Sequence, residues 1–518
     1  MITRPPRGVQ CRPMNKLTAN LLYFFFAVIL VRFVGAITTF IIARILSPAD
    51  YGIWVTLLVI ASYAPILCLG TVEALVKMFP FYAGKGELEK ARLLESNVLG
   101  SLAITAAFIL AAGATFQLFT HAPAIRSLDN VIRLIVLAAA MAVFSAFYYY
   151  RFTAHQNFRY VSFIDSLRAI GMFVLIVPFA WRWGLMGAAI AFVVNEFLVL
   201  SWSYAANGRV LGKVAIGFDF RAMRNLVAIG FPITVIWWVY MLQMSADRLI
   251  SMSMLGKEAT GFYGLGASMV SAIVLVPMVL GRVLYPKVNE EVGKNTNREG
   301  LNRYVLVPAQ GLGLVVPFLI GTLIILTPEI YRIFFPKYIR GILSAQILFI
   351  GVYFVCLIRT GVNYLVAIDK QNKVLGYVVV SLCLNVIVSV ALVKLGLSIE
   401  GISIGTSVSG LVLAVLIWIS VFANLGYTRQ KQYGELASLM VPFLICAILS
   451  VGLLVLCRGV AAPRYYPLAL YCAAGIFAAL YGAAVFTIPP LTSWNRTLFS
   501  RLREEITNAF SRRTSAVS

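Results

Sequence analysis

Residues 43–52 read ARILSPADYG, and they close one long apolar run of the chain before opening the next. A related stretch follows in the second half, where residues 246–264 read ADRLISMSMLGKEATGFYG. Tyr51-Gly52 therefore corresponds to Tyr263-Gly264, 212 residues later. Self-similarity at a fixed offset is the signature of internal duplication. The sequence predicts two copies of one structural unit.

Two further matches extend this correspondence. Residues 153–157 (TAHQN) are echoed by residues 367–372 (AIDKQN), and residues 184–188 (GLMGA) by residues 397–402 (LSIEGI). The matches keep their order at a nearly constant offset, which favours duplication over chance. An even number of spans in each copy leaves both copies in the same orientation, related by an axis along the membrane normal. This pattern is typical of transporters.

The composition places the chain in a membrane. Hydrophobic residues make up 61% of its 518 residues and charged residues only 12%. A soluble domain of this size could not keep so much apolar side chain away from water. The apolar runs last about 20 residues or more, which is the length that a helix needs to cross a bilayer. Since backbone polar groups in lipid must be satisfied within the segment, we expect helices and exclude a β-barrel.

The sequence predicts an all-α integral membrane protein with about 14 transmembrane helices, arranged as two pseudo-symmetric six-helix lobes plus two C-terminal helices. The expected spans are residues 18–45, 52–80, 92–119, 129–150, 159–181, 184–206, 223–250, 260–286, 304–328, 342–366, 374–394, 400–424, 436–457 and 466–488. The expected parts are a basic N-terminus (1–17), an N-lobe (18–206), an inter-lobe linker (207–222), a C-lobe (223–425), the last two spans (436–488) and a tail (489–518).

The charge distribution predicts the orientation. Arg4, Arg7, Arg12 and Lys16 precede the first apolar run, which has no cleavage site and is long enough to remain as a membrane helix. Lys and Arg concentrate in alternate loops on the same side as this N-terminus, so both termini are expected in the cytoplasm. Topology thus accounts for much of the net charge of +23. No soluble domain remains for nucleic-acid binding, and no P-loop is present for ATP hydrolysis.

Cysteine and histidine give no sign of a metal site. Most of the seven cysteines lie within apolar runs, where reduced thiols pack as small hydrophobes. The two histidines, His121 and His155, fall in predicted loops far apart in sequence. We therefore expect no bound metal and no cofactor. From about residue 491 the tail alternates apolar and basic residues at near-helical spacing, which predicts an amphipathic helix on the inner leaflet.

Ionisable residues inside the expected spans mark the candidate site, because a charge facing lipid is costly and usually faces a partner or a water-filled cavity. These residues are Arg32, Glu73, Lys77, Asp165, Arg168, Glu196, Asp247, Arg248, Arg282, Arg359 and Lys394. The candidates for substrate binding are Arg32, Arg248, Arg282, Arg359 and Lys77, and the candidates for ion coupling or ion pairing are the acids Glu73, Asp165, Glu196 and Asp247.

Several of these residues have a simpler explanation. Lys77, Asp247, Arg248, Arg282 and Lys394 lie near predicted span ends and could extend to the interface. Asp165 and Arg168 are three residues apart, and Glu73 and Lys77 four, so each spacing allows a local pair on one helix. Arg32 stands apart, because it lies deep in a helix without an acid. The excess of deep cations favours a cavity for an anion such as a phosphate or pyrophosphate group.

Several stretches resemble polysaccharide-exporting flippases of the multidrug/oligosaccharidyl-lipid/polysaccharide exporter superfamily. They are residues 44–52, residues 69–74 (LGTVEA) with Phe79-Pro80, residues 246–263, residues 328–332 (PEIYR), and Asn385 ahead of Gly396 and Gly401. The resemblance covers about residues 18–425. It implies alternating access that moves an undecaprenyl-pyrophosphate-linked oligosaccharide across the bacterial inner membrane for O-antigen, capsule or exopolysaccharide synthesis. Arg32 would contact the substrate in the lumen, and Arg248 and Arg282 are further candidates for such a contact.

The resemblance also bears on partners and on the rest of the superfamily. The implied partners are the lipid-linked substrate, membrane lipids, and a glycan polymerase with its chain-length regulator. Peptidoglycan-precursor flippases are similar at Arg32 and Gly35, but they carry an Arg-Asp pair where this chain has Thr38-Thr39. Drug/cation antiporters typically carry an acid in the first helix, and none is present here.

Two alternatives to a flippase remain open at the level of sequence. A cation-coupled multidrug antiporter of the same superfamily would need Asp165 or Glu196 as its coupling acid. A membrane glycan polymerase or ligase would need a substantial exterior catalytic loop, and the exterior loops look too short for one. Duplication favours transport over catalysis, so we expect that the protein is not an enzyme.

Overall fold

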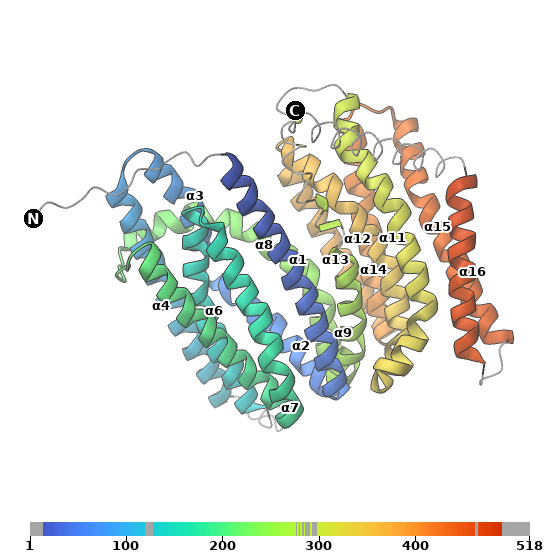
Figure 1. The fold of residues 1–518 in the computed structure, drawn as a ribbon, viewed down its shortest axis with the longest axis horizontal. Helices are drawn as coiled ribbons and strands as arrows, with labels where there is room; N and C mark the ends of the chain where they lie inside the picture. Colours follow the sequence, from blue (N-terminus) through green and yellow to red (C-terminus); the bar gives the residue numbers. More distant parts are fainter. Residues whose placement is uncertain are drawn as a thin grey trace, which may run out of the picture. The chain divides into compact units, whose positions relative to one another are not determined.

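The computed structural model describes residues 14–119, 128–275, 298–460 and 465–488, together with single positions between 277 and 292. The described residues form helices and connecting turns, without a strand among them (Figure 1). The helices of the first half are α1 (Met14–Ile45), α2 (Pro48–Ser62), the 3₁₀ helix η1 (Ala64–Cys68), α3 (Thr71–Gly84), α4 (Leu88–Phe119), α6 (Asp129–Ala154), α7 (Phe158–Val210) and α8 (Phe220–Met254).

The second half continues the all-helical pattern. Its helices are α9 (Gly256–Ile273), α11 (Arg298–Phe334), the 3₁₀ helix η2 (Pro336–Gly341), α12 (Ile342–Ala367), α13 (Gln371–Lys394), α14 (Ile399–Asn424), α15 (Arg429–Val460) and α16 (Tyr466–Thr487). Within the described residues, ten helical segments are long and apolar enough to cross a membrane. The predicted all-α membrane fold is confirmed. The predicted amphipathic tail and the first 13 residues of the predicted basic N-terminus (1–17) lie outside the described residues, and α1 begins within this N-terminus at Met14.

The chain divides into two compact units. Unit 1 comprises Met1–Leu46 and Leu57–Trp238, and unit 2 comprises Ser47–Thr56 and Val239–Ser518. The predicted lobe limits near residues 206 and 223 stay a prediction. The change from unit 1 to unit 2 falls inside α8, between Trp238 and Val239. One continuous helix therefore belongs to both units.

Unit 1 is a bundle in which α1 and α6 pack on α7, and α4 and α3 pack on α6 (Figure 1). Its core contains the fully buried side chains of Val98, Leu102, Val143 and Phe147. The long helix α7 is interrupted at Trp183 and Gly184, where the backbone leaves helical geometry. Gly184 has a φ of 57°, a conformation that only glycine adopts at little cost. The two arms of α7 match the predicted fifth and sixth spans.

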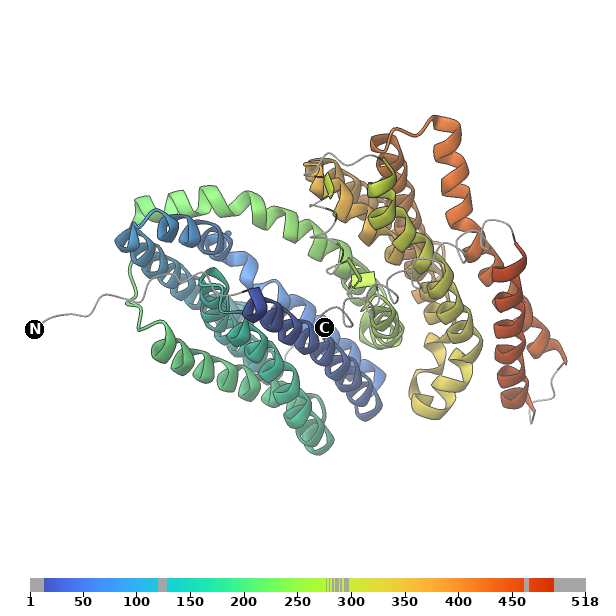
Figure 2. The same cartoon turned by 45° about the horizontal axis from the view of Figure 1, so that its top comes forward.

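The second predicted span, residues 52–80, is not one continuous helix. The chain passes from α2 into η1 and then into α3, and Leu69 and Gly70 both adopt left-handed backbone geometry between them. A Cβ atom on Gly70 would lie 2.2 Å from the Gly230 carbonyl carbon on α8, so only glycine fits there. Figure 2 shows α8 as a long curved helix. The helix break thus brings η1 and α3 into backbone contact with α8.

Unit 2 has α12 at its centre, in contact with α9, α11 and α14, while α13 packs on α14 and both α15 and α16 pack on α11 (Figure 1). Large aromatic side chains fill its core, including the fully buried Trp418, Tyr353, Phe349 and Phe422. Tyr353 donates a hydrogen bond to the Leu439 carbonyl oxygen on α15, which satisfies its buried hydroxyl.

The two copies of the duplicated motif pack on each other inside unit 2. A Cβ atom on Gly52 would lie 1.9 Å from the Lys257 carbonyl oxygen, and one on Gly261 would lie 1.8 Å from the Pro48 carbonyl oxygen. The Tyr51 hydroxyl lies 3.1 Å from the Ser268 hydroxyl. Small residues at these positions let the backbones of α2 and α9 touch, as in other membrane helix pairs. The first residues of α2 therefore belong to unit 2.

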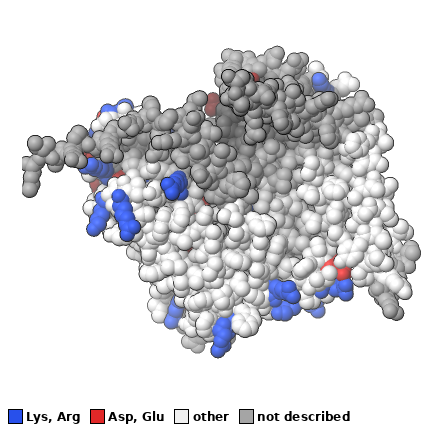
Figure 3. All heavy atoms as spheres, viewed as in Figure 1, with Lys and Arg blue, Asp and Glu red and all other residues white. Residues whose placement is uncertain are grey.

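The outer faces of both units carry large apolar side chains that water would not tolerate. Trp181, Leu118 and Phe119 in unit 1 and Ile448 in unit 2 are each at least 70% exposed. In Figure 3 the visible face of unit 1 is largely uncharged between Lys and Arg side chains gathered at its two ends. An uncharged belt bounded by charges is the surface that a bilayer covers. The protein is a multi-pass membrane protein.

Candidate functional site

An ion pair joins the two arms of α7 in unit 1. Arg168 Nε donates to Glu196 Oε1 over 3.0 Å, and Arg168 Nη2 also donates to the Ser145 hydroxyl over 2.8 Å. Asn195 donates to the Arg168 carbonyl oxygen over 3.1 Å. Glu196 is only 2% exposed, so its charge requires this partner. The sequence analysis considered only the neighbouring Asp165 as a partner for Arg168. It did not predict the pair with Glu196, because the two residues lie 28 positions apart.

Asp165 lies one turn before Arg168 and faces α6. The Tyr149 hydroxyl donates a hydrogen bond to Asp165 Oδ2 over 3.4 Å. Asp165 and Glu196, the two acids that an antiporter would need for coupling, are thus both engaged with side chains of unit 1.

Glu73 lies in the first turn of α3, immediately after the helix break. Its Oε2 atom is buried and has no hydrogen-bond partner among the described residues. Lys77, four residues later, is exposed, and no ion pair joins the two side chains in the described part of the chain. The local pair that the spacing allowed is therefore not formed. The Thr234 side chain of α8 lies beside the Glu73 carboxylate.

Arg32 lies on α1 and its side chain is exposed. It forms no hydrogen bond or ion pair with another described residue. An arginine within a membrane span, as the sequence predicts for Arg32, needs either water or an anionic partner. The Arg32 guanidinium is exposed and can therefore contact such a partner.

A polar cluster links four helices of unit 2. Asp247 on α8 is 8% exposed, and its carboxylate accepts hydrogen bonds from the Tyr263 hydroxyl and from the Arg248 backbone N–H. The Tyr263 hydroxyl lies 3.4 Å from the Thr406 hydroxyl on α14, which accepts a hydrogen bond of 3.3 Å from the Asn385 amide on α13. The cluster ties α8, α9, α13 and α14 together and satisfies the buried carboxylate.

Two arginines of unit 2 keep buried nitrogen atoms without partners. The Nε atoms of Arg248 and Arg359 are both inaccessible to water, and neither has a hydrogen-bond partner among the described residues. The Arg359 side chain packs directly on Gly281, where an added Cβ would lie 2.8 Å from its Cγ. Asn363, one turn later, donates to the Gly281 carbonyl oxygen over 2.8 Å. Arg282, the remaining predicted cation, lies outside the described residues.

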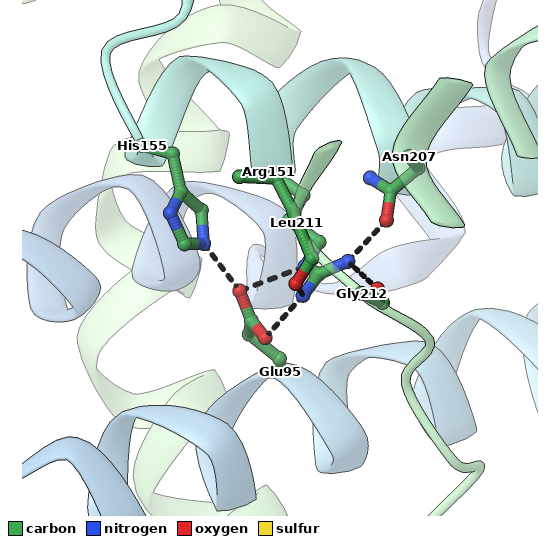
Figure 4. A network of polar contacts seen from close by, with 6 residues as sticks. All are labelled: Glu95, Arg151, His155, Asn207, Leu211 and Gly212. Carbon is green, nitrogen blue, oxygen red and sulfur yellow. Dashed lines mark hydrogen bonds and ion pairs between the residues drawn. The ribbon is translucent and has the colours of Figure 1, made fainter. Parts of the chain in front are cut away.

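The sequence analysis missed the most extensive buried network of charged side chains in unit 1 (Figure 4). Arg151 near the end of α6 forms a bidentate pair with Glu95 of α4, with distances of 2.8 Å and 3.0 Å. His155 Nε2 lies 2.8 Å from the same carboxylate. Arg151 also donates to the Asn207 side chain and to the Gly212 carbonyl oxygen, the latter over 2.9 Å. The side chains of Arg151 and Glu95 are only 4% and 3% exposed.

The sequence does not reveal this network because the predicted span of residues 129–150 ends before Arg151 and His155, which puts both residues in a predicted loop. Glu95 lies near the start of the span predicted for residues 92–119, where an acid is not unusual. A buried bidentate pair shared by α4 and α6 is structural in character, and its contacts with residues 207–212 hold the chain that leads to α8. The described residues hold no group of three or more His, Cys, Asp or Glu side chains placed to bind a metal ion.

The family model described as polysaccharide biosynthesis protein matches residues 17–290, which is more than half of the chain. The chain belongs to this family. Among solved structures, the fold of this chain is similar to that of the lipid II flippase MurJ in its inward closed conformation, with 13% identity and a TM-score of 0.69. That match covers 90% of this chain and 99% of the flippase.

Transporters of the multidrug resistance MATE family are also similar in fold to this chain. An inward-facing MATE transporter of the MOP superfamily matches at 14% identity and a TM-score of 0.65, covering 76% of this chain and 94% of that chain. The Vibrio cholerae transporter VcmN matches at 15% identity and a TM-score of 0.55, covering 80% and 97%. No curated sequence matches the chain. At these identities the similarity shows a common fold.

Proposed function

We propose that this protein moves lipid-linked oligosaccharides across the bacterial inner membrane by alternating access, for the synthesis of surface polysaccharides. Membership of the polysaccharide biosynthesis family and a transporter fold both support the proposal. Both termini would face the cytoplasm, as the loop charges predict. The protein would act by transport rather than by catalysis.

The observation that carries the proposal is that three arginines of the predicted spans have side-chain nitrogen atoms without hydrogen-bond partners in the described part of the chain. Arg32 has no partner among the described residues, and Arg248 and Arg359 each keep a buried Nε without one. A buried guanidinium nitrogen without a hydrogen-bond acceptor gains strongly from an anionic ligand. The pyrophosphate that links an oligosaccharide to its lipid is such a ligand. These three arginines are the proposed substrate contacts, while Lys77 on the exposed face of α3 is a weaker one.

The test compares strains that differ only in this gene. Deletion should cause a lipid-linked oligosaccharide to accumulate in lipid extracts analysed by mass spectrometry, and the surface polymer should disappear from polysaccharide stains. The wild-type gene should restore both. A polymerase defect would also leave lipid-linked oligosaccharides in the membrane. The two defects are distinguished by adding a glycosidase to the periplasmic side of the membrane. Glycan that is protected from the enzyme supports a flippase, and glycan that is cleaved contradicts one.

Variants then connect the function to the arginines. Arg32→Gln, Arg248→Gln and Arg359→Gln should each reduce surface polymer at normal protein abundance. Arg340→Gln provides the matched control, because Arg340 is an exposed arginine at the end of η2. Normal export by all three variants would remove the arginines from the proposed site.

The alternative is a cation-coupled multidrug antiporter, which the similarity to MATE transporters supports. In this function Asp165 or Glu196 would bind the coupling ion. Glu196 would then have to release Arg168 in each cycle. Increased drug sensitivity of the deletion strain, with unchanged lipid-linked glycans and polymer, would favour the antiporter.

A further inference from the structure

A groove between α4 and α6 in unit 1 is lined by none of the proposed substrate contacts. Its volume is about 470 Å³, which is within the range of pockets that hold small molecules. Several of its lining side chains are exposed, so the groove opens on the surface of unit 1. We call it the α4–α6 groove. Its apolar wall is formed by Leu110, Ala114, Leu118 and Val136, and its polar end by Gln117 and Arg133.

The apolar wall follows the two helices where they touch. A Cβ atom on Gly113, which also lines the groove, would lie 2.6 Å from Val136 Cγ1, so glycine lets α4 lie directly against α6. Leu110 and Leu118 on the wall are 44% and 74% exposed. On a membrane protein such exposed leucines contact lipid chains rather than water. The wall of the groove can therefore hold an acyl chain.

Two polar side chains form the other end of the groove. Arg133 Nε donates to Gln117 Oε1 over 3.0 Å, and Gln117 Nε2 donates to the Asp129 carbonyl oxygen over 3.0 Å. The Gln117 amide is thus held by the α6 backbone, and it orients the Arg133 guanidinium. Arg133 is exposed, and among the described residues its Nη atoms have no partner and the Asp129 carboxylate forms no ion pair with it. The guanidinium therefore keeps N–H donors for an anion.

The polar end lies near the ends of both helices. Gln117 is two residues before the last residue of α4, and Arg133 is four residues after the first residue of α6. Leu110 lies seven residues, or about 10 Å, further into α4. Arginines near the ends of membrane helices reach the headgroup layer with their guanidinium groups. The groove thus joins a cation at headgroup depth to an apolar wall that runs toward the middle of the bilayer.

We propose that the α4–α6 groove binds an anionic phospholipid, with the phosphate on Arg133 and one acyl chain along Leu110, Ala114 and Val136. Arginine binds phosphate through several N–H donors, and basic pockets between transmembrane helices bind anionic lipid head groups. A small anion would leave the apolar wall uncovered, and a zwitterionic lipid would bring an ammonium group close to the guanidinium. The inference does not depend on which substrate is transported.

The first test locates the bound lipid. The full chain is placed in phosphatidylcholine nanodiscs with a trace of phosphatidylglycerol or phosphatidylcholine that carries a photoactivatable diazirine on one acyl chain. After illumination, phosphatidylglycerol should label residues 110–118 and 133–136 more than phosphatidylcholine does. This labelling should fall roughly tenfold in Arg133→Gln, because a hydrogen bond to a charged group is lost. It should persist in Arg182→Gln, since Arg182 is an exposed arginine beside Trp183 and does not line the groove. Equal labelling by the two lipids, or unchanged labelling of Arg133→Gln, would overturn the proposal.

The second test addresses the apolar wall. Ala114→Trp fills the groove, whereas Ala112→Trp adds the same side chain at an exposed position of α4 that does not line it. Phosphatidylglycerol labelling should fall in Ala114→Trp and persist in Ala112→Trp. Melting temperature and gel filtration confirm that each variant is folded, and Ala114→Leu replaces Ala114→Trp if the larger side chain prevents folding. Persistent labelling in a folded variant with a filled groove would overturn the groove as the lipid site. Dimers that lose the labelling would assign the groove to a second copy of the chain and would overturn the proposal as well.

Discussion

At the scale of single residues, the charges of unit 1 are distributed between two kinds of site. Arg151 and Glu95 neutralise each other inside a network that is closed by backbone carbonyl oxygens. Glu73 has no such partner, and Arg32 is exposed on its helix. A fully satisfied network rigidifies the helices that it joins, whereas an unsatisfied group keeps the capacity to bind something else. The satisfied network therefore supports the fold, and we expect function at the charged groups that lack partners.

The Arg151–Glu95 pair gives a prediction at this scale. Arg151→Met removes the partner of a carboxylate that is 3% exposed, and breaking a buried pair on one side costs about 3–5 kcal/mol. Thermal unfolding in detergent should show a large drop in the melting temperature. The double variant Arg151→Met/Glu95→Leu should recover much of it, because no uncompensated charge remains. Arg159→Met, at an exposed position, serves as the control. An unchanged melting temperature of Arg151→Met would contradict a structural role for the network.

At the scale of helices, glycine decides how closely α2 and α9 approach. Gly52→Ala would place a Cβ 1.9 Å from the Lys257 carbonyl oxygen, which is backbone and cannot rotate away. We expect the two helices to separate and the protein to lose about 1–3 kcal/mol of stability, the usual cost of overpacking. Gly434→Ala in α15 meets nothing within 4 Å, so it should stabilise by roughly 0.4–1 kcal/mol through the unfolded state. Opposite shifts of the two melting temperatures are the expected result, and equal shifts would disprove the close contact.

The helices also show how far sequence could predict this fold. Apolar runs of membrane length located most spans, because hydrophobicity and length are local properties. The break at residues 63–70 was not found, since the run stays apolar and only backbone contact between Gly70 and Gly230 reveals it. The ion pair between Arg168 and Glu196 could not be predicted from the sequence for a similar reason. The two residues lie on different arms of α7, and the packing of one arm on the other depends on the turn at Trp183 and Gly184, not on the spacing along one helix.

At the scale of the whole molecule, the two compact units do not follow the predicted copies exactly along the chain. Residues 47–56 belong to the predicted first copy but pack within unit 2, and α8 runs from unit 1 into unit 2. The motif at Tyr51-Gly52 and its counterpart at Tyr263-Gly264 meet through glycine contacts. A motif that repeats along the sequence therefore also meets its copy in space.

The orientation of the whole molecule gives the last prediction. The loop charges place Gln371, the first residue of α13, in the cytoplasm and Ser398, just before α14, outside. Both positions are exposed, so single cysteines there should be chemically accessible in a chain freed of its seven native cysteines. A membrane-impermeant maleimide added to spheroplasts should label Ser398→Cys at once and Gln371→Cys only after lysis. Because α13 alone separates the two positions, the reverse pattern would invert every span of unit 2 and place the C-terminal tail outside. Labelling of both in unbroken spheroplasts would mean that α13 does not cross the membrane.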